Sequence, residues 1–386
     1  METNTRDLAV ELRHGFRQFC EKHITPFAND FDREQAIPSS LIEKMAAMGY
    51  LGATVPTTYG GMGWNQQTAA VLFEEIGKAC SSVRSILTVH LSLVTETIYR
   101  WGTPEQKNRW LPDLASGKKI AAFALTEPET GSDAKSISSS FTDKDNQYIL
   151  NGTKKWITFG QRADCFLVFA RDVDGISAFL LEKDNPGLSV KPISDMMGTR
   201  ASLLAELRLT DCVVSANCLL GKRGWGFTQV VNTALDNGRF SVTTGTLGLA
   251  KACLEQSITF VCYRKQFGTL LKEHQLIKQK IAAMTANVKA ASLLCKDAAE
   301  ERDQASPNAI IKTVVAKYFT TKIASEAAAD ALQIHGALGF HGSSNVQRFY
   351  RDARVMEVIE GSTELQQIVI SDHAVNDLDS IINGNL

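Results

Sequence analysis

The chain has 386 residues, of which 44% are hydrophobic and 22% are charged, and its formal net charge is −1. This length fits two or three globular domains with substantial cores. A net charge near zero excludes a broad basic surface for nucleic acid or an anionic membrane. No stretch reaches the roughly 18 consecutive apolar residues of a transmembrane helix, and residues 1–16 contain no apolar secretory core. We therefore expect a cytoplasmic protein without a membrane or nucleic-acid partner.

Residues 1–118 are expected to form a helical domain. Residues 41–48 and 68–80 carry helix-forming residues with apolar side chains three to four positions apart. Turn residues such as Ile37-Pro38 separate these segments. The sequence Thr-Pro-Glu-Gln at 103–106 predicts a capped helix start with proline at the first helical position.

Between residues 119 and 228 the pattern changes to short runs of β-forming residues. Asn, Gly, Asp and Pro separate these runs, for example at Asn151-Gly152 and at 185–187. Several short strands at close spacing indicate a small β-barrel or sandwich domain. The predicted strands are Tyr148–Leu150, Lys155–Thr158, Cys165–Ala170, Ile176–Glu182, Leu188–Val190 and Ala205–Val214.

Residues 229–386 return to a helical pattern. Apolar residues recur every three or four positions from Ile277 to Ala298, and again from Leu247 to Val261. Each stripe gives a helix one apolar face, which is typical of the core of a helical bundle. The expected fold class is therefore α+β multidomain, with helices, then strands, then helices.

Several kinds of active site are excluded by their missing motifs. The histidines lack partners at metal-ligand spacing and no HExxH occurs, so we expect no metal site. Neither a GxSxG elbow, nor GxGxxG, nor a P-loop motif is present. The eight cysteines form no CxxC pair and lie mostly in apolar runs, which favours buried, reduced thiols over disulfides.

Two segments combine residue types that could carry chemistry. Residues 123–133 (FALTEPETGSD) run from a strand-like start into a polar turn whose hydroxyl and backbone donors could bind a ring edge or a pyrophosphate. A solvated loop is the alternative interpretation of this segment. In residues 350–364, Glu360 is followed by Gly361, which permits close approach of backbone or ligand. A carboxylate in an apolar cleft would have a raised pKa and could act as a general base, whereas an exposed glutamate at a helix end would not.

Together these segments resemble the acyl-CoA dehydrogenase family, and the resemblance covers nearly the whole chain. Any one of the matching motifs is weak, but five in the same order are a strong signal. The motifs are TEPxTGSD at 126–133, NGxKxWIT at 151–158, RKQFG at 264–268 followed by His274-Gln275, QIHG at 333–336 with Gly339-Phe340, and YRDA at 350–353 leading to EGSTE at 360–364.

The resemblance implies a helical N-terminal domain at 1–118, a β-domain at 119–228 and a C-terminal four-helix bundle at 229–386. It implies FAD bound without a covalent link between the β-domain and the C-terminal helices. It also implies a homo-oligomer, a dimer or tetramer, in which part of the FAD site crosses a subunit interface. The electron acceptor of such an enzyme would be an electron-transfer flavoprotein or oxygen.

The resemblance also assigns cofactor roles to particular residues. Leu125 and Thr126 would bond the flavin ring edge, Ser132 would reach the pyrophosphate, and Trp156 and Thr158 would lie against the ring. Phe123, Ser362 and Glu364 belong to the same predicted cofactor set. The adenine end would be held by Arg264, Phe267, Gln275, Gln333 and Gly336.

Glu360 stands where most family members carry the catalytic base. A minority place the base one helix earlier, where this sequence has Gly238, which cannot serve. The family reaction removes the α-proton of an acyl thioester and transfers a hydride from Cβ to the flavin, while the protein orients both. Arg239 and Gly361 complete the predicted substrate contacts near the base.

Arg84 and Ser85 separate this chain from the usual fatty acyl-CoA members, which have small or apolar residues where Arg84 stands. With the segment 356–362, Arg84 resembles a smaller branch that oxidises three-carbon hydroxyacyl or aminoacyl groups on acyl carrier proteins. That branch helps to make hydroxymalonyl, methoxymalonyl or aminomalonyl extender units for polyketides. A surface or interdomain ion pair is the alternative interpretation of Arg84.

Two other functions stay open. The first is a short-chain acyl-CoA dehydrogenase of fatty-acid or amino-acid catabolism, against which a polar group in the acyl pocket argues. The second is a redox-silent scaffold that binds flavin without turnover, against which the presence of Glu360 and every flavin motif argues.

Overall fold

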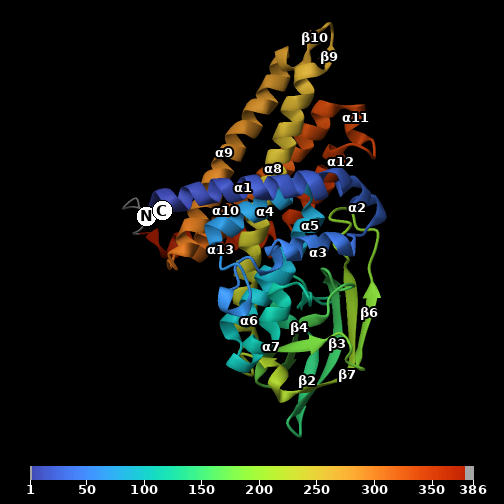
Figure 1. Cartoon of the computed structure of the whole chain (residues 1–386), viewed down its shortest axis with the longest axis vertical. Helices are drawn as coiled ribbons and strands as arrows, with labels where there is room; N and C mark the ends of the chain where they lie inside the picture. Colours follow the sequence, from blue (N-terminus) through green and yellow to red (C-terminus); the bar gives the residue numbers. More distant parts are fainter. Residues whose placement is uncertain (1, 379–386) are drawn as a thin grey trace.

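The computed structural model describes residues 2–378 and has the expected order of helices, strands and helices (Figure 1). The sheet lies towards the lower end of the long axis in this view, and the longest C-terminal helices extend to the upper end. Within residues 2–378, no helix combines the length and the apolar character needed to span a membrane.

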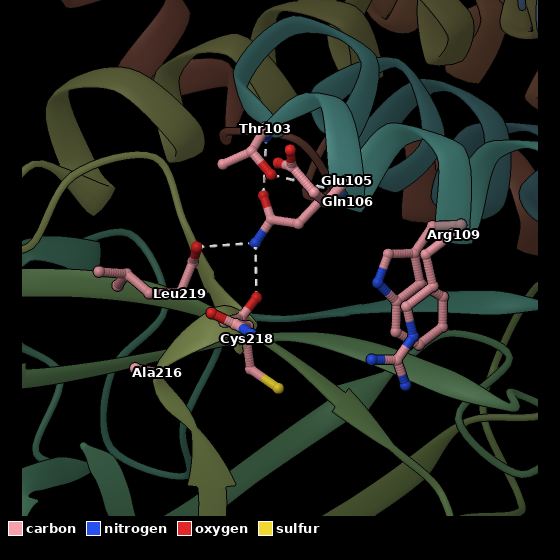
Figure 2. A pocket seen from close by; sticks show the side chains of 9 residues that line it. Thr103, Glu105, Gln106, Arg109, Ala216, Cys218 and Leu219 are labelled. Carbon is pink, nitrogen blue, oxygen red and sulfur yellow. Dashed lines mark hydrogen bonds between the residues drawn. The ribbon is translucent and has the colours of Figure 1, made fainter.

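The N-terminal helices surround a continuous apolar core. The capped helix start predicted at Thr103 is confirmed, because Thr103 and Gln106 exchange hydrogen bonds as a capping box (Figure 2). The Gln106 amide also donates to the carbonyls of Asn217 and Leu219, which joins this helix to the sheet. The elements are α1 (Glu2–His23), α2 (Ala28–Glu34), α3 (Ser39–Ala47), α4 (Gln66–Ala79), α5 (Ser81–Ile86), the π-helical η4 (Leu87–Thr95), α6 (Glu96–Trp101) and α7 (Pro104–Ala115).

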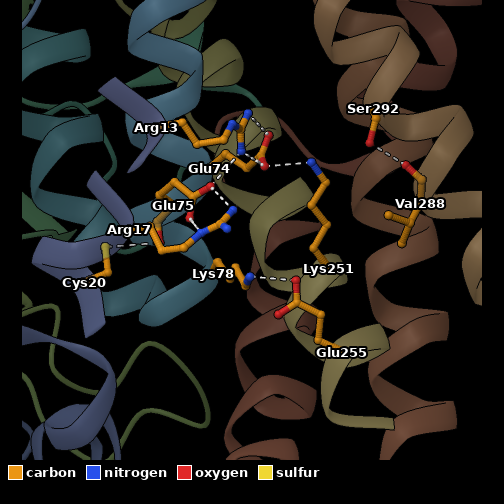
Figure 3. A network of polar contacts seen from close by, with 10 residues as sticks. All are labelled: Arg13, Arg17, Cys20, Glu74, Glu75, Lys78, Lys251, Glu255, Val288 and Ser292. Atoms are coloured by element: carbon orange, nitrogen blue, oxygen red, sulfur yellow. Dashed lines mark hydrogen bonds and ion pairs between the residues drawn. The ribbon is translucent and has the colours of Figure 1, made fainter. Parts of the chain in front are cut away.

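Helix α1 is attached to the rest of the molecule by ion pairs (Figure 3). Arg13 Nη1 lies 2.6 Å from Glu74 and 2.7 Å from Glu75, both on α4. Lys251, on helix α8 (Asn232–Tyr263), lies 2.7 Å from the same Glu74. Both glutamates are buried. Because removal of one partner would leave an uncompensated buried charge, this network holds α1 against α4 and α8.

The β-domain is one mixed sheet in which β4 has both faces covered. Alternate residues from Cys165 to Phe169 pack into the N-terminal core, and those from Phe166 to Ala170 pack into the interior of the β-domain. This two-sided burial explains why the strand is apolar at every position from Cys165 to Ala170. The strands are β1 (Ala121–Ala124), β2 (Ser140–Lys144), β3 (Gln147–Ile157), β4 (Cys165–Asp172), β5 (Gly175–Glu182), β6 (Leu188–Pro192), β7 (Ala205–Ser215) and β8 (Leu219–Leu220), in the order β6-β7-β3-β2-β4-β5-β8 with β1 parallel to β4.

Strand β3 differs from the sequence prediction. Two strands were predicted at 148–150 and 155–158, whereas β3 is continuous over Gln147–Ile157. Its pairing with β7 shifts between Leu150 and Gly152 and again between Lys154 and Ile157. Such bulges leave residues out of the ladder and bend the strand, which is why the sequence pattern breaks where the strand does not.

The predicted stripe on α9 is buried from Met284 onwards, whereas in the predicted stripe on α8 Leu247, Ala250 and Val261 are buried and Ile258 is 41% exposed. Residues from Met284 to Ala298 of α9 are buried at the expected spacing, and α10 packs against α8, α9, α12 and α13. The domain limit expected at residue 118 falls after α7, and the limit expected at 228 falls within the π-helical η7 (Gly226–Val231). Both limits stay predictions. The remaining elements are β9 (Lys265–Gln266), β10 (Thr269–Leu270), α9 (Gln275–Asp303), α10 (Ala309–His335), α11 (Ala337–Phe340), α12 (Asn345–Met356) and α13 (Thr363–Asn376).

Helices α4 and α8 approach each other at glycine positions. A Cβ atom added to Gly248 would lie 2.0 Å from the Glu74 carbonyl oxygen, and one added to Gly77 would lie 2.2 Å from the Gly245 carbonyl oxygen. Both contacts are with backbone, which cannot move aside as a flexible side chain can. The two helices therefore pack at this distance only because these residues are glycine.

Gly248→Ala should destabilise the protein, because the added methyl group forces α4 and α8 apart. Overpacking of this kind costs about 1–3 kcal/mol. Urea unfolding followed by circular dichroism should show the loss. Gly15→Ala is the matched control, because Gly15 lies on an exposed face of α1 with open space around its Cβ position. An unfolding midpoint for Gly248→Ala equal to that of the control would contradict the packing argument.

Candidate active site

Glu360 lies in the turn between α12 and α13. Its φ of +55° is in the left-handed region, which a non-glycine residue adopts rarely, and Gly361 follows with φ +92°. Ser362 then caps α13 by accepting a hydrogen bond from the Leu365 amide. Two successive residues with positive φ reverse the chain between the helices and leave the Glu360 side chain pointing towards α8 and η4.

Gly238 of α8 provides the space for the Glu360 carboxylate. A Cβ atom at Gly238 would lie 2.6 Å from Glu360 Oε2 and 2.6 Å from Leu93 of η4. Oε2 is buried and has no hydrogen-bond partner. Burial raises the pKa of Glu360 to about 7, against the opposing positive charges of Lys317, Arg239 and Arg84. The carboxyl group can therefore exchange a proton near neutral pH.

Arg84 is the second ionisable group of this region. Its side chain is 1% exposed, and it donates to Thr88 Oγ1 and, at 3.3 Å, to the sulfur of Met356. Burial lowers the pKa of Arg84 to about 10, while the negative charges of Glu360 and Asp352 oppose this shift. Among the described side chains of residues 11–378 no carboxylate forms an ion pair with Arg84, so the surface or interdomain ion pair considered from the sequence is not formed there.

Arg84 and Glu360 both lie against one face of α8. The stem of Arg84 occupies the space beside Gly245, since a Cβ atom there would be 2.6 Å from Arg84 Cδ. Gly245 follows Gly238 by two helical turns, about 10 Å along the axis. Between them Ser241 Oγ lies 2.8 Å from Thr88 Oγ1, and Thr88 is the acceptor for Arg84. A stripe of small residues on α8 thus has the acid at one end and the guanidinium at the other.

The remaining predicted substrate residues have defined partners. Arg239 Nε donates to the Glu360 carbonyl at 3.2 Å, and burial lowers the pKa of Arg239. Ser85 Oγ donates to the Ser82 carbonyl at 2.7 Å and to Ser202 Oγ at 3.0 Å. Ser85 therefore joins α5 to the loop before β7, and its hydroxyl is already committed to protein partners.

The predicted flavin-side residues lie at the adjoining ends of β1 and β3. Leu125 and Thr126 follow β1, and the Lys155 amide donates to the Thr126 carbonyl at 2.9 Å, which ties the two strand ends together. Trp156 sits in the second bulge with φ +62°, and its ring is 44% exposed. Phe123 in β1 and Thr158 just after β3 are partly buried. Ser132 is exposed in the loop after β1, and Glu364 is exposed in the first turn of α13.

A buried ion pair organises this segment and was missed by the sequence analysis. Lys154 Nζ lies 2.7 Å from Glu127 and donates to the Leu125 carbonyl at 3.2 Å. Glu127 also accepts hydrogen bonds from Ser138 and Ser139. Although burial alone would raise it, the pKa of Glu127 is lowered to about 2 by Lys154 and these donors. The alternation of exposed and buried positions along β3 could have marked Lys154 as inward-facing.

The predicted adenine-end residues lie at the far end of the molecule. Arg264 precedes the β9–β10 hairpin, and Phe267 at its tip is 94% exposed, with φ +50°. Gln275 begins α9, Gln333 lies in the last turn of α10, and Gly336 follows that helix as its C-cap. Figure 1 places this hairpin at the upper end of the long axis, away from the strands that carry Trp156. One chain therefore does not bring its two sets of predicted cofactor residues together.

These residues fit a large, flat, anionic cofactor such as FAD. An uncovered indole held outward by a bulge offers a stacking face for a ring system. The exposed Phe267 ring and Arg264 offer a second aromatic and a cation at the other end. A separate pocket of about 390 Å³ lies between α7 and the start of β8 (Figure 2). Its Gln106 amide already donates to two backbone carbonyls, so that amide is not available to a cofactor.

Comparison with known proteins assigns the chain and its fold to one family. Family models of the N-terminal, middle and C-terminal domains of acyl-CoA dehydrogenases match residues 7–118, 122–212 and 223–375. The mitochondrial short-chain specific acyl-CoA dehydrogenase of Mus musculus is 36% identical over 367 residues, which is 94% of this chain and 89% of that protein. Butyryl-CoA dehydrogenase from Megasphaera elsdenii superposes with a TM-score of 0.92 at 32% identity, covering 96% of this chain and 98% of that one.

Two further similar structures have names that refer to an acyl carrier protein or to an extender unit. The prolyl acyl carrier protein oxidase AnaB has a TM-score of 0.90 at 30% identity, covering 95% of this chain and 98% of that one. FkbI, for biosynthesis of the methoxymalonyl extender unit of a polyketide, has a TM-score of 0.86 at 28% identity, covering 93% of this chain and 99% of that one. The three domain matches and the whole-chain similarity together show that the chain belongs to the acyl-CoA dehydrogenase family and is an FAD-dependent oxidoreductase.

Proposed function

We propose that the chain dehydrogenates a small acyl thioester with a polar substituent, and that Glu360 is its catalytic base. The observation that carries the proposal is the buried, unpartnered Oε2 of Glu360. An oxygen without a hydrogen-bond donor is free to accept a proton from a substrate. A pKa near 7 means that the carboxylate and its protonated form are both accessible at neutral pH.

The other residues of the site hold and orient the reacting groups. When bound, FAD supplies the acceptor for the hydride that leaves Cβ of the acyl group. Trp156, Thr126, Thr158, Leu125 and Ser132 would hold its ring and pyrophosphate side. Gly238 leaves room for the carboxylate of Glu360 beside α8, and the neighbouring cations keep part of that carboxylate ionised despite its burial.

Arg84 favours a substrate with an anionic or hydroxyl-bearing acyl group. A buried guanidinium without a carboxylate partner is costly, so a substrate group that pairs with it would bind with a large gain. The planar fork would also fix the orientation of that group. Because Glu360 lies at the other end of the α8 stripe, the acyl group would lie between Arg84 and Glu360 and would be small. A hydroxylated or aminated three-carbon acyl group satisfies both conditions.

The acyl group could be carried by an acyl carrier protein or by CoA. We favour an acyl carrier protein in extender-unit biosynthesis, because AnaB is named for such a carrier and FkbI for an extender unit. The alternative is a short-chain acyl-CoA dehydrogenase, which the 36% identity to the mouse enzyme favours. A mass-spectrometric assay against butyryl-CoA, glutaryl-CoA and three-carbon hydroxyacyl and aminoacyl carrier proteins separates these functions. Absence of flavin bleaching with every substrate would favour the redox-silent scaffold instead.

Glu360→Gln should abolish turnover while FAD stays bound. The amide preserves the shape but cannot accept the α-proton, and loss of a general base costs about 10²–10⁴-fold in rate. In the unmodified enzyme the rate of flavin bleaching should rise tenfold per pH unit below about pH 7 and level off above it, because only the ionised carboxylate can act. The control Glu326→Gln alters an exposed acid on α10 and should leave the rate and the profile unchanged. Near-normal bleaching by Glu360→Gln would place the base elsewhere.

Arg84→Met should lower kcat/KM for the polar three-carbon substrate and leave activity on butyryl-CoA equal or improved. The first effect follows from loss of a charge-assisted hydrogen bond worth about 1.5–3 kcal/mol, or roughly 10- to 150-fold. The second follows because a buried cation without a partner has been removed. Arg33→Met, which removes an exposed arginine of α2, is the control. Equal losses on both substrates would make Arg84 a structural residue.

We also propose a homo-oligomer in which each FAD contacts two chains, because the two sets of predicted cofactor residues lie at opposite ends of one chain. Retention of FAD should then depend on protein concentration, with flavin fluorescence rising as the holoenzyme is diluted and the oligomer dissociates. Arg264→Ala should shift this release to higher protein concentration. Release independent of protein concentration, from a protein that is monomeric by light scattering, would refute the shared site.

A further inference from the structure

The turn that carries Glu360 is held by side-chain donors from three helices. Arg239 of α8 donates to the Glu360 carbonyl at 3.2 Å. Lys317 of α10 and Gln366 of α13 both donate to the next carbonyl, that of Gly361, with Gln366 Nε2 at 3.2 Å. Positive φ is unfavourable for a non-glycine residue and persists only where the surroundings enforce it. These donors provide that enforcement at two adjacent peptides.

Lys317 is the least expected of the three donors. Its side chain is 0% exposed, and among the side chains that the structure describes, those of residues 11–378, no carboxylate oxygen lies within ion-pair distance of its Nζ. Burial of an ammonium group without an ion-pair partner is strongly unfavourable. A methionine or leucine would fill the same core position of α10 without that cost. The lysine therefore has a role that a packing residue could not supply.

We propose that Lys317 is a positioning residue for Glu360: it holds the Glu360–Gly361 turn through the Gly361 carbonyl, and its positive charge favours the ionised carboxylate. The inference rests on the proposed function of Glu360 as the base. It deepens that function by assigning control of the base to a side chain on another helix, 43 positions earlier in the sequence.

The charges around Glu360 fix the direction of the expected effect. The cations that face it are Lys317 from α10, Arg239 from α8 and Arg84 from α5, while Glu357, after α12, acts on Lys317. Burial lowers the pKa of Lys317 to about 8, so the ammonium is still charged at pH 7. Loss of this charge would raise the pKa of Glu360 further above 7. Less carboxylate would then be ionised at pH 7, and the deficit would shrink as the pH rises.

The ionisation of Glu360 can be measured without any substrate. The infrared band of its protonated carboxyl group, identified by its absence in Glu360→Gln, should titrate near pH 7 in the unmodified holoenzyme. In Lys317→Met the midpoint should move up by about one unit, and this shift alone should lower flavin bleaching at pH 7 by the best thioester of the substrate panel about fivefold. Part of that loss should be recovered at pH 9. The control is Lys322→Met, which removes an exposed lysine from the same helix and should change neither readout.

Two further variants separate the charge from the hydrogen bond. Lys317→Gln keeps a donor for the Gly361 carbonyl without the charge, so its midpoint should shift as in Lys317→Met while bleaching at pH 9 returns to the unmodified rate. Gln366→Leu removes the uncharged donor to the same carbonyl, so bleaching should fall at every pH with the midpoint unchanged. This variant also tests the turn if Lys317→Met does not fold.

Other outcomes would overturn the inference. A midpoint and rate in Lys317→Met equal to those of Lys322→Met would remove the role of the charge. Equal bleaching rates at pH 9 in Lys317→Met and Lys317→Gln would remove the role of the hydrogen bond to the Gly361 carbonyl. Failure of the proposed function has a different signature, because Glu360→Gln would then bleach its flavin normally while the infrared midpoint still responded to Lys317.

Discussion

The burial of one ionisable carboxylate at a left-handed turn is the constraint on which the rest of the site depends. A pKa raised from 4.5 to about 7 corresponds to a destabilisation of about 3 kcal/mol when the group is ionised. The sign follows from linkage: the unfolded chain ionises first, so the contribution of Glu360 to stability is most favourable below pH 4.5, falls between pH 4.5 and about 7, and is constant above. The positive φ of Glu360 adds its own cost. Gly238, Gly361 and the donors on the two turn carbonyls are the features that make this conformation attainable.

Helix α8 connects that turn to the rest of the fold through its glycines. Gly238 accommodates the carboxylate, Gly245 accommodates the stem of Arg84, and Gly248 lets α4 approach backbone to backbone. Arg239 on the same helix holds the Glu360 carbonyl. A bulky residue at Gly238 or Gly245 would therefore displace a charged side chain, whereas one at Gly248 would displace a whole helix. The site and the packing of the N-terminal helices are consequently set by the same helix surface.

The sequence predicts those features that rest on local patterns. The capped start of α7, the apolar β4 and the stripe on α9 follow from residue spacing, and the motif around Glu360 points to the correct family. Contacts between distant residues could not be predicted in this way. Lys317 lies in a helix where a lysine ordinarily reaches solvent, and Lys154 pairs with Glu127 across two strand ends, 27 positions apart. Ser85 has a plausible position in the motif, but its hydroxyl is bonded to Ser82 and Ser202, a partnership that only the tertiary fold creates.

The arrangement of charge also bears on the direction of the proposed proton transfer. Before the transfer the negative charge is on Glu360, and afterwards it is on the acyl group. Arg84, Arg239 and Lys317 stay charged throughout, so the acyl group acquires its negative charge in surroundings that already contain three cations. Preorganised charges of this kind stabilise a developing anion because they need not reorient during the reaction. The same cations that keep Glu360 partly ionised before the transfer would thus stabilise the anion that the transfer creates, and a polar substituent near Arg84 would keep that anion in place.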